Sequence, residues 1–399
     1  MQVRGNGFFE GTLAQRNEFE SVRVFDTTLR DGEQTPRTSF SYDAKLAVAK
    51  ALDDANVDVI EAGFPANGEA EAKAVADVAE ATDATTCGLA RVVESDVEAA
   101  LDAGVDMVHV FASTSDVQIE DSMHTTRDEV TERSVAAVER AVDAGVEVMF
   151  SPMDATRTDP DYLAAVVEAV DDAGVDWVNV PDTCGVATPR RFGDLVEFVG
   201  EHTDARIDVH THDDFGLATA NALAGVEAGA DQVQVSVNGI GERAGNAAFE
   251  EVVMSAESVY GADTGVDTTA IADIAEIVAE RSSVPVPVNK PVVGANAFAH
   301  ESGIHAAGVI ENSETFEPGV MTPEMVGAER EVVLGKHSGT HAVRQHLEDA
   351  GFAPTDDEVR AVTRKVKAHA ADEEVVTQAV LRAFAGEVGV HRERGEVTA

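Results

Sequence analysis

The chain has 399 residues, of which 74 are acidic and 29 are basic, and its formal net charge is -45. Such a charge repels nucleic acid and anionic membrane surfaces, which excludes both as partners. Apolar residues make up 44% of the chain, so we expect a folded protein with an acidic surface and not a disordered polymer. We interpret the charge as that of a halophilic protein, in which concentrated counter-ions screen the self-repulsion.

The cysteine content and the apolar runs indicate where the protein works. Cys87 and Cys184 lie far apart and form neither a disulfide framework nor a Cys-x-x-Cys metal motif. No apolar run approaches the roughly 20 residues needed to cross a bilayer, and the amino terminus lacks the apolar core of a secretory signal. We therefore expect a cytoplasmic protein.

A short phrase recurs along the chain. Ala-Gly-Val-Asp or a close variant occupies residues 55–58, 103–106, 144–147, 173–176 and 228–231. Each copy closes a helical stretch, and an apolar run follows it, as expected where a helix ends at glycine and leads into a buried parallel strand. The eight runs are residues 22–25, 57–62, 86–90, 107–111, 146–150, 177–180, 207–210 and 232–237. This alternation predicts an α/β protein with a (β/α)8 TIM barrel, and an open doubly wound sheet is the alternative.

Polar residues follow these strands, at the face where barrels hold their active sites. His210 and His212 are two residues apart, so in a strand they project to the same side, as half of a metal site would. Two structural histidines are the alternative. The other strand ends carry Arg30-Asp31-Gly-Glu33-Gln34, Glu61-Ala-Gly-Phe-Pro65, Ser151-Pro-Met153-Asp154, Asp182-Thr183-Cys184-Gly185 and the glycine-rich stretch 238–246, which could equally be a tight loop.

Four long motifs give the chain a family resemblance. Residues 25–36 (FDTTLRDGEQTP), 210–216 (HTHDDFG), 238–246 (NGIGERAGN) and 298–305 (FAHESGIH) closely resemble the family of 2-isopropylmalate, homocitrate and citramalate synthases. The similarity covers about residues 20–350 and includes Leu334-Gly-Lys-His-Ser-Gly339. Enzymes of this family condense acetyl-CoA with a 2-oxo acid and release CoA by hydrolysis. The resemblance therefore implies acetyl-CoA as a co-substrate and a small 2-oxo acid as the acceptor.

By this resemblance, one divalent metal ion (Mn, Mg or Zn) is bound by Asp31, His210, His212 and Asn246. Such oxygen and nitrogen ligands would leave coordination positions open for the 2-oxo acid. The family assigns Arg30 to the alkoxide that forms when the acetyl-CoA enolate attacks, a role that suits a fixed positive charge. An ion pair of Arg30 with Glu33 or Glu61 is the alternative.

The resemblance implies further substrate-binding and catalytic residues. Thr183 matches the threonine that holds the oxo-acid carboxylate, with a hydroxyl that caps the following helix as the alternative. Ser151 and Gln34 are also expected to bind substrate. His305 matches a histidine that a carboxyl-terminal segment contributes for proton transfer. The family's dimeric architecture implies a homodimer and leaves open that His305 serves the neighbouring subunit.

Three positions depart from the family pattern. Met153 replaces a glutamate that contributes to substrate handling or deprotonation, and the adjacent Asp154 is a candidate to substitute for it. Gln118 replaces a histidine, and Phe316 replaces a tyrosine with a supporting catalytic role. The uncharged Met153 favours an apolar acceptor, 2-oxoisovalerate or pyruvate, over 2-oxoglutarate. Against this, the length and the sequence around Glu242 look most like the archaeal homocitrate synthase branch.

The domain organisation follows from composition. We expect a catalytic barrel over residues 20–282, a proline-rich linker over 283–299 and a helical C-terminal subdomain over 300–399. Within the subdomain, residues 356–371 and 373–385 predict amphipathic helices. Only about sixty residues follow the Gly-Lys-His-Ser-Gly motif, so we expect no leucine-binding regulatory domain.

The sequence thus predicts an acyltransferase. It would be a 2-isopropylmalate synthase of leucine biosynthesis or an (R)-citramalate synthase of isoleucine biosynthesis, with homocitrate synthase as the alternative within the family. Two other classes stay open. A lyase of the hydroxymethylglutaryl-CoA type would favour a cysteine-bearing loop and lack the His305 arm, and a non-catalytic barrel would bind metal and ligand without releasing CoA.

Overall fold

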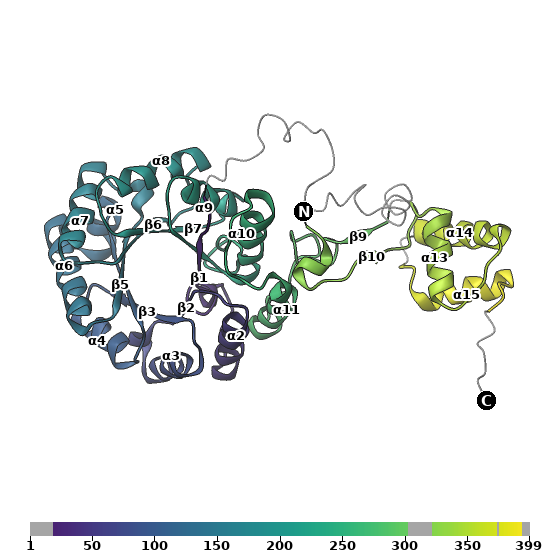
Figure 1. The fold of residues 1–399 in the computed structure, drawn as a ribbon, viewed down its shortest axis with the longest axis horizontal. Coiled ribbons are helices and arrows are strands. Elements are labelled where there is room, and N and C mark those ends of the chain that lie inside the picture. The colour runs from purple at the N-terminus through teal and green to yellow at the C-terminus, as the bar shows by residue number, and fades with distance from the viewer. Residues whose placement is uncertain (1–18, 302–320, 373–374, 393–399) are drawn as a thin grey trace. The chain divides into compact units, whose positions relative to one another are not determined.

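A computed structural model describes residues 19–301, 321–372 and 375–392 of the chain. These residues form two compact units (Figure 1). The first unit contains residues 19–286 and 291–293, and the second contains the other described residues. The boundary falls within the proline-rich segment 283–299. His305 and Phe316 lie outside the described residues.

The first unit is built on eight parallel strands that close into a barrel (Figure 1). Each strand pairs with the next one along the chain, and β8 pairs with β1. The predicted TIM barrel is therefore confirmed, and the open doubly wound sheet is wrong. The strands are β1 (Arg23–Asp26), β2 (Val59–Gly63), β3 (Thr85–Arg91), β4 (Met107–Ser113), β5 (Glu147–Met153), β6 (Trp177–Asp182), β7 (Arg206–Thr211) and β8 (Gln232–Val235).

Helices surround this barrel (Figure 1). They are α2 (Tyr42–Asp54), α3 (Glu69–Ala81), α4 (Glu94–Asp102), α5 (Asp116–Gln118), α6 (Arg127–Ala144), α7 (Pro160–Asp172), α8 (Pro189–Gly200), α9 (Ala218–Glu227), α10 (Phe249–Ser255) and α11 (Ile271–Ser282). The recurring Ala-Gly phrase ends several of them as predicted. After α6, for example, Gly145 has φ of +80° and donates its N–H to the carbonyl of Val142, a left-handed conformation that glycine adopts without strain.

Short helical turns shape the loops between these elements. They are η1 (Gly32–Gln34), η2 (Pro65–Asn67), η3 (Ile119–Met123), η4 (Ala155–Arg157), η5 (Val237–Gly239), η6 (Ala256–Tyr260) and η7 (Thr268–Ala270). Because Val237 already belongs to η5, β8 is two residues shorter than the predicted run 232–237.

The barrel interior changes from apolar to polar along the strands. One fully buried side chain from each of β1 to β6 joins an interior cluster: Phe25, Val59, Cys87, Met107, Met149 and Trp177. Two residues further along a strand, side chains return to the same face. On β2 to β6 these next residues are Glu61, Leu89, His109, Ser151 and Asn179. A mainly polar layer of side chains thus lies next to the apolar cluster, on the side of the carboxyl ends of the strands.

The second unit has its own helical core. Helices α13 (Thr340–Asp349), α14 (Asp356–Ala371) and α15 (Gln378–Val388) contribute most of it, and η9 (Pro323–Val326) precedes them. Two short strands, β9 (Ala299–His300) and β10 (Glu331–Val332), pair in parallel. The prediction of a helix over 356–371 is confirmed. The predicted helix over 373–385 instead begins at Gln378, because the Thr377 side chain caps the N–H of Val380.

None of the helices among the described residues is long and apolar enough to cross a membrane.

Candidate metal centre and active site

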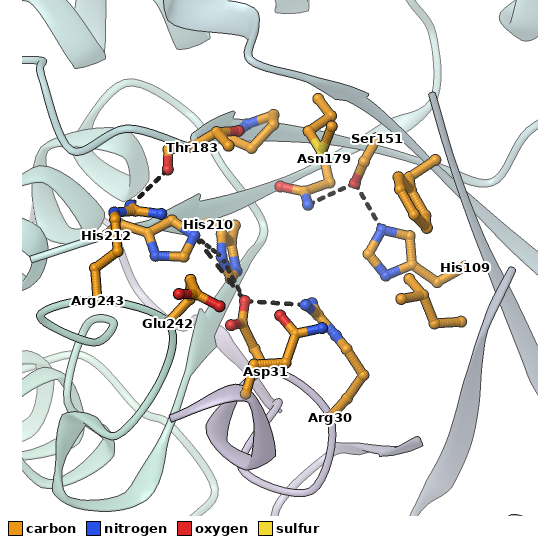
Figure 2. Close-up of a pocket in the computed structure, with 15 residues that line it drawn as sticks. Arg30, Asp31, His109, Ser151, Asn179, Thr183, His210, His212, Glu242 and Arg243 are labelled. Carbon is orange, nitrogen blue, oxygen red and sulfur yellow. Dashed lines mark hydrogen bonds and ion pairs between the residues drawn. The ribbon is translucent and has the colours of Figure 1, made fainter. Parts of the chain in front are cut away.

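A cavity of about 230 Å³ lies at the carboxyl ends of the barrel strands (Figure 2). Seven of its residues were predicted as site residues from the sequence, and the loop after β1 supplies three of them, Arg30, Asp31 and Gln34. The complete lining is Arg30, Asp31, Gln34, Leu89, His109, Phe111, Ser151, Met153, Asn179, Pro181, Thr183, His210, His212, Glu242 and Arg243. The active-site face that the fold predicts is therefore the face that contains the cavity.

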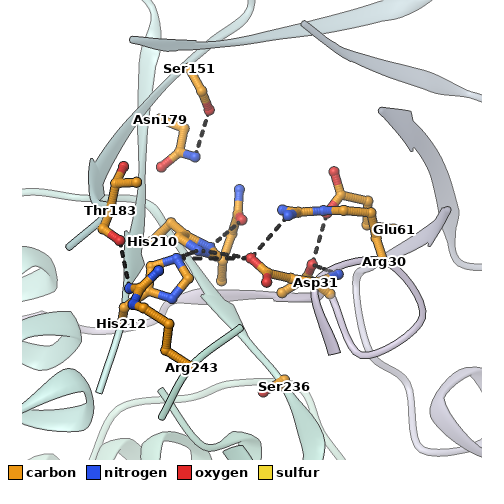
Figure 3. A network of polar contacts seen from close by, with 12 residues as sticks. Arg30, Asp31, Glu61, Ser151, Asn179, Thr183, His210, His212, Ser236 and Arg243 are labelled. Atoms are coloured by element: carbon orange, nitrogen blue, oxygen red, sulfur yellow. Dashed lines mark hydrogen bonds and ion pairs between the residues drawn. The ribbon is translucent and has the colours of Figure 1, made fainter. Parts of the chain in front are cut away.

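The two histidines of β7 and Asp31 form a buried cluster in this cavity (Figures 2 and 3). The Nε2 atom of His210 lies 3.1 Å from the Nε2 atom of His212 and 3.2 Å from Oδ2 of Asp31. The Nε2 atom of His212 lies 4.0 Å from the same oxygen. Three donor atoms this close together have the arrangement of ligands that bind one metal ion.

Unpartnered polar atoms support this arrangement. Oδ1 of Asp31 and both side-chain amide atoms of Asn246 are buried without a hydrogen-bond partner among the described residues. The backbone of Asn246 forms a bridge to that of His212, which brings the fourth predicted ligand beside the cluster. Because buried polar groups normally have partners, these atoms fit a site that binds a cation.

The electrostatics also favour metal binding. Burial opposes the charge on Asp31, yet Arg30 and the two histidines together hold the pKa of this carboxyl well below its usual range. Burial, followed by repulsion from His210, lowers the pKa of His212 to about 3. The cluster therefore presents an ionised carboxylate and a neutral imidazole at neutral pH, which are the forms that bind metal.

Arg30 makes two ion pairs within the site. Its Nε lies 2.6 Å from Oε2 of Glu61 and its Nη1 lies 2.9 Å from Oδ2 of Asp31 (Figure 3). The ion pair weighed from the sequence is thus present with Glu61 and not with Glu33, which pairs with Lys45 at 2.8 Å. Since Arg30 also lines the cavity, its pairing with Glu61 fixes the guanidinium without removing it from the site.

Thr183 and Asp154 lie next to each other beyond β6 and β5. Oγ1 of Thr183 accepts a hydrogen bond from the N–H of Asp154 at 2.9 Å, and the N-cap position of the helix that follows, α8, is Thr188, five residues further on. The alternative that Thr183 caps this helix is therefore wrong. The buried carboxylate of Asp154 accepts hydrogen bonds from Ser115 and Arg157. Met153, and not Asp154, lines the cavity, so the proposed substitution of Asp154 for the missing glutamate has no support.

Several cavity residues were not identified from the sequence, above all His109 and Asn179. His109 lies in the apolar run of β4, and Asn179 lies in that of β6. The sequence feature that could have identified them is the two-residue period of a strand. It places His109 on the same interior face as Met107, and Asn179 on the same interior face as Trp177. Arg243 and Glu242 follow β8, and Arg243 is held by Asp214 at 2.8 Å.

Comparisons with known proteins agree with the barrel and its site. Residues 21–278 match the family described as HMGL-like. The chain belongs to the HMGL-like family. Residues 292–374 match a second family, described as homocitrate synthase post-HMGL domain-like. Among solved structures, a hydroxymethylglutaryl-CoA lyase from Pseudomonas aeruginosa is 28% identical with a TM-score of 0.59, over 66% of this chain and 94% of the lyase.

Curated relatives place the chain more narrowly. A probable 2-isopropylmalate synthase of Methanosarcina mazei is 49% identical over 92% of this chain and 72% of the relative. A 2-isopropylmalate synthase of Sulfolobus acidocaldarius is 47% identical over 92% of this chain and 95% of the relative. A protein of Methanopyrus kandleri that is named as a putative (R)-citramalate synthase is 46% identical over 92% of this chain and 73% of the relative. These similarities confirm the predicted class, an acetyl-CoA-condensing acyltransferase of the 2-isopropylmalate and citramalate synthase group.

Proposed function

We propose that this chain is a metal-dependent 2-isopropylmalate synthase, which condenses acetyl-CoA with 2-oxoisovalerate and releases CoA. The observation that supports the proposal most is the buried cluster of Asp31, His210 and His212, which shares its cavity with Arg30. A mixed set of oxygen and nitrogen donors is compatible with Mn, Mg or Zn.

Asp31, His210, His212 and Asn246 would bind the ion. When bound, it would act as a Lewis acid on the keto and carboxylate oxygens of the acceptor. Arg30 would stabilise the negative charge that develops on the keto oxygen when the acetyl carbon attacks. The ion pairs of Arg30 with Glu61 and Asp31 hold the guanidinium in position for this role, so little reorganisation is needed during the reaction.

The other predicted site residues would bind the acceptor or move protons. Because Oγ1 of Thr183 already accepts the N–H of Asp154, its own O–H is available to donate to the acceptor carboxylate. Gln34 and Ser151 line the same cavity and would bind the substrates beside it. His305 would serve proton transfer.

The choice of acceptor rests on the apolar wall of the cavity. Leu89, Phe111, Met153 and Pro181 line it. Such a wall favours an isopropyl group over a methyl group, because each additional buried carbon stabilises the complex by about 0.8 kcal/mol. It also favours an isopropyl group over the second carboxylate of 2-oxoglutarate, since burial of an unpaired charge is costly. Pyruvate, the acceptor of a citramalate synthase, is the second candidate because of the 46% identical relative.

The cellular setting is part of the proposal. The net charge of -45 suits the cytoplasm of a halophile, where salt screens the acidic surface. The chain would act as a homodimer, with residues 20–282 as the catalytic barrel and residues 300–399 as a helical subdomain.

The deciding experiment measures free thiol release from acetyl-CoA by the full chain in high salt with Mn or Mg. We expect release that depends on the acceptor and is fastest with 2-oxoisovalerate among 2-oxoisovalerate, pyruvate and 2-oxoglutarate. Acceptor-independent cleavage of hydroxymethylglutaryl-CoA would indicate a lyase, and binding of metal without thiol release would indicate a non-catalytic barrel. His210→Ala should abolish turnover and weaken metal binding in calorimetric titration, and undiminished turnover in this variant would refute the assigned site.

A further inference from the structure

Four hydrogen-bonded side chains form a row at the cavity, and three of them, His109, Ser151 and Asn179, line it. Glu61 on β2, His109 on β4, Ser151 on β5 and Asn179 on β6 belong to the row, and all four are buried. Nδ1 of His109 lies 2.7 Å from Oε1 of Glu61, and Nε2 of His109 lies 2.6 Å from Oγ of Ser151. Nδ2 of Asn179 donates to the same Oγ at 2.7 Å (Figure 2). A carboxylate, an imidazole and a hydroxyl are thus aligned as in acid–base catalysts.

The donors around Glu61 determine which atom of each pair in this row donates the hydrogen bond. Nε of Arg30 and Oγ1 of Thr27 donate to Oε2 of Glu61 at 2.6 and 2.8 Å. Burial opposes the charge on Glu61, yet Arg30 and His109 lower its pKa to about 2, so the carboxylate is ionised. Its other oxygen must therefore accept the Nδ1–H of His109. This tautomer leaves a lone pair on Nε2, at the end of the ring that faces Ser151 and the cavity.

Burial is the main reason why the ring of His109 is neutral. Burial lowers the pKa of His109, and the positive charge of Arg30 and the field of His210 act in the same direction, while Glu61 opposes them. A neutral ring beside a fixed carboxylate can accept a proton at Nε2, because the resulting imidazolium would be stabilised through Nδ1.

A second metal site is the competing interpretation, since ligand atoms of Glu61, Cys87 and His109 lie within 4.8 Å of one another. Two observations argue against it. The guanidinium of Arg30 already occupies one oxygen of Glu61 and would repel a cation. Burial, with a further contribution from Glu61, raises the pKa of the Cys87 thiol well above its usual value, whereas a metal ligand must be a thiolate.

Most other titratable groups of the described cavity lining have different roles. Asp31, His210 and His212 would bind the metal ion, and the two arginines remain protonated. His109 and Glu242 remain, and Glu242 lies in the partly exposed loop after β8. We infer that His109, oriented by Glu61, is the base that removes a proton from the methyl group of acetyl-CoA. This inference rests on the proposed condensation.

The step balances without a further reagent. A C–H bond of the acetyl methyl group breaks, its electron pair passes into the enolate of the thioester, and the proton goes to Nε2 of His109 as the Ser151 hydroxyl turns aside. The enolate carbon then forms a bond to the keto carbon of the acceptor, and the electrons move onto the keto oxygen. The imidazolium of His109 returns its proton to this oxygen, which restores the neutral ring.

The test is His109→Gln in the full chain, assayed in high salt with Mn, acetyl-CoA and 2-oxoisovalerate. We expect kcat to fall by about 100-fold or more while KM for 2-oxoisovalerate changes by less than about threefold. The isotope ratio is kcat with unlabelled acetyl-CoA divided by kcat with methyl-deuterated acetyl-CoA. We expect this ratio to be larger in His109→Gln than in wild type, because proton removal becomes rate-limiting. A loss confined to KM, or a slowed kcat with an unchanged isotope ratio, would overturn the inference and leave His109 as a binding residue.

Two further variants make the result decisive. Glu61→Gln keeps the size of the side chain but removes its charge. Like His109→Gln, it should lower kcat and raise the isotope ratio. The inference therefore stays testable if His109→Gln does not fold. Glu242→Gln tests the rival base and should leave the isotope ratio unchanged; a raised ratio in this variant would transfer the role to Glu242. If the wild-type chain releases no thiol with any 2-oxo acid, the proposed function itself fails. If the wild-type chain is active and His109→Gln is equally active, only the inference about His109 fails.

Discussion

Oε1 of Gln234 lies 2.8 Å from Nδ1 of His210, and this contact fixes which ring nitrogen of His210 faces Asp31. Nε2 of Gln234 donates to Oδ2 of Asp208 at 2.6 Å, so the amide cannot easily rotate. The carbonyl oxygen of Gln234 must then accept Nδ1–H of His210, which leaves the Nε2 lone pair for a metal ion. The orientation of this predicted ligand is therefore set by side chains deeper in the barrel.

We predict that Gln234→Leu weakens metal binding by about 10- to 100-fold, because His210 loses the partner that holds its tautomer and ring orientation. Calorimetric titration of the metal-free chain with Mn measures the effect directly. Gln232→Leu is the matched control, since Gln232 also donates to Asp208, at 3.1 Å, but has no hydrogen bond to His210. Equal losses in the two variants would show that barrel packing, and not orientation of His210, controls affinity.

The apolar cavity wall leads to a prediction about acceptor choice. Leu89 is buried and lines the cavity, so Leu89→Ala should remove contacts to the isopropyl group of 2-oxoisovalerate. We expect kcat/KM for 2-oxoisovalerate to fall by about 10- to 100-fold and that for pyruvate to fall much less. Leu163→Ala, at a buried position outside the described cavity lining, should lower stability without changing the ratio of the two acceptors. An unchanged ratio in Leu89→Ala would place the acceptor side chain elsewhere.

The fold could be predicted because its signals are local. Each strand is a short apolar run, a helix-ending glycine precedes four of them (β4, β5, β6 and β8), and eight such runs left little choice of architecture. His210 and His212 were predicted for the same reason, because they share one side of a strand. Asp31, in the loop after β1, was predicted as their partner from the family resemblance.

The remaining features depend on contacts that no local pattern encodes. His109 and Asn179 lie within apolar runs, and their role emerges only once the barrel closes and places them beside Ser151. The partner of Arg30 could not be chosen between Glu33 and Glu61, because the choice depends on Lys45, a buried residue of α2 that binds Glu33. The start of α15 was misplaced because the cap at Thr377 outweighs the helix propensity of the residues before it.

The acidic composition leads to a prediction about salt. With a net charge of -45, the folded chain repels itself more strongly than the expanded chain does unless counter-ions screen the charges. We expect the melting temperature to fall steeply when KCl is lowered from about 2 M to about 0.1 M, where the screening length increases to about 10 Å. Sucrose at matched osmotic strength serves as the uncharged control. A melting temperature that does not depend on salt would contradict the halophilic interpretation.

A buried acid at the end of β1 leads to a prediction about pH. Asp26 is fully buried and accepts hydrogen bonds from the N–H and O–H of Thr28, both at 2.9 Å. Burial raises its pKa to about 7, and the nearby carboxylates Glu250 and Glu61 add to this rise. The folded chain therefore holds a proton on Asp26 that the unfolded chain releases near pH 4.

The sign of the effect follows from this difference. The proton stabilises the native state fully below about pH 4, and this contribution is lost as pH rises through about 7. Asp26→Asn cannot titrate, so the free energy of unfolding of the variant relative to wild type should increase from pH 4 to pH 7, by on the order of 1 kcal/mol per pH unit. Urea unfolding at several pH values in high salt measures it, with Asp43→Asn, at an exposed position, as the control for loss of one charge. A difference between Asp26→Asn and wild type that stays flat across this range would show that Asp26 is ionised in the folded chain.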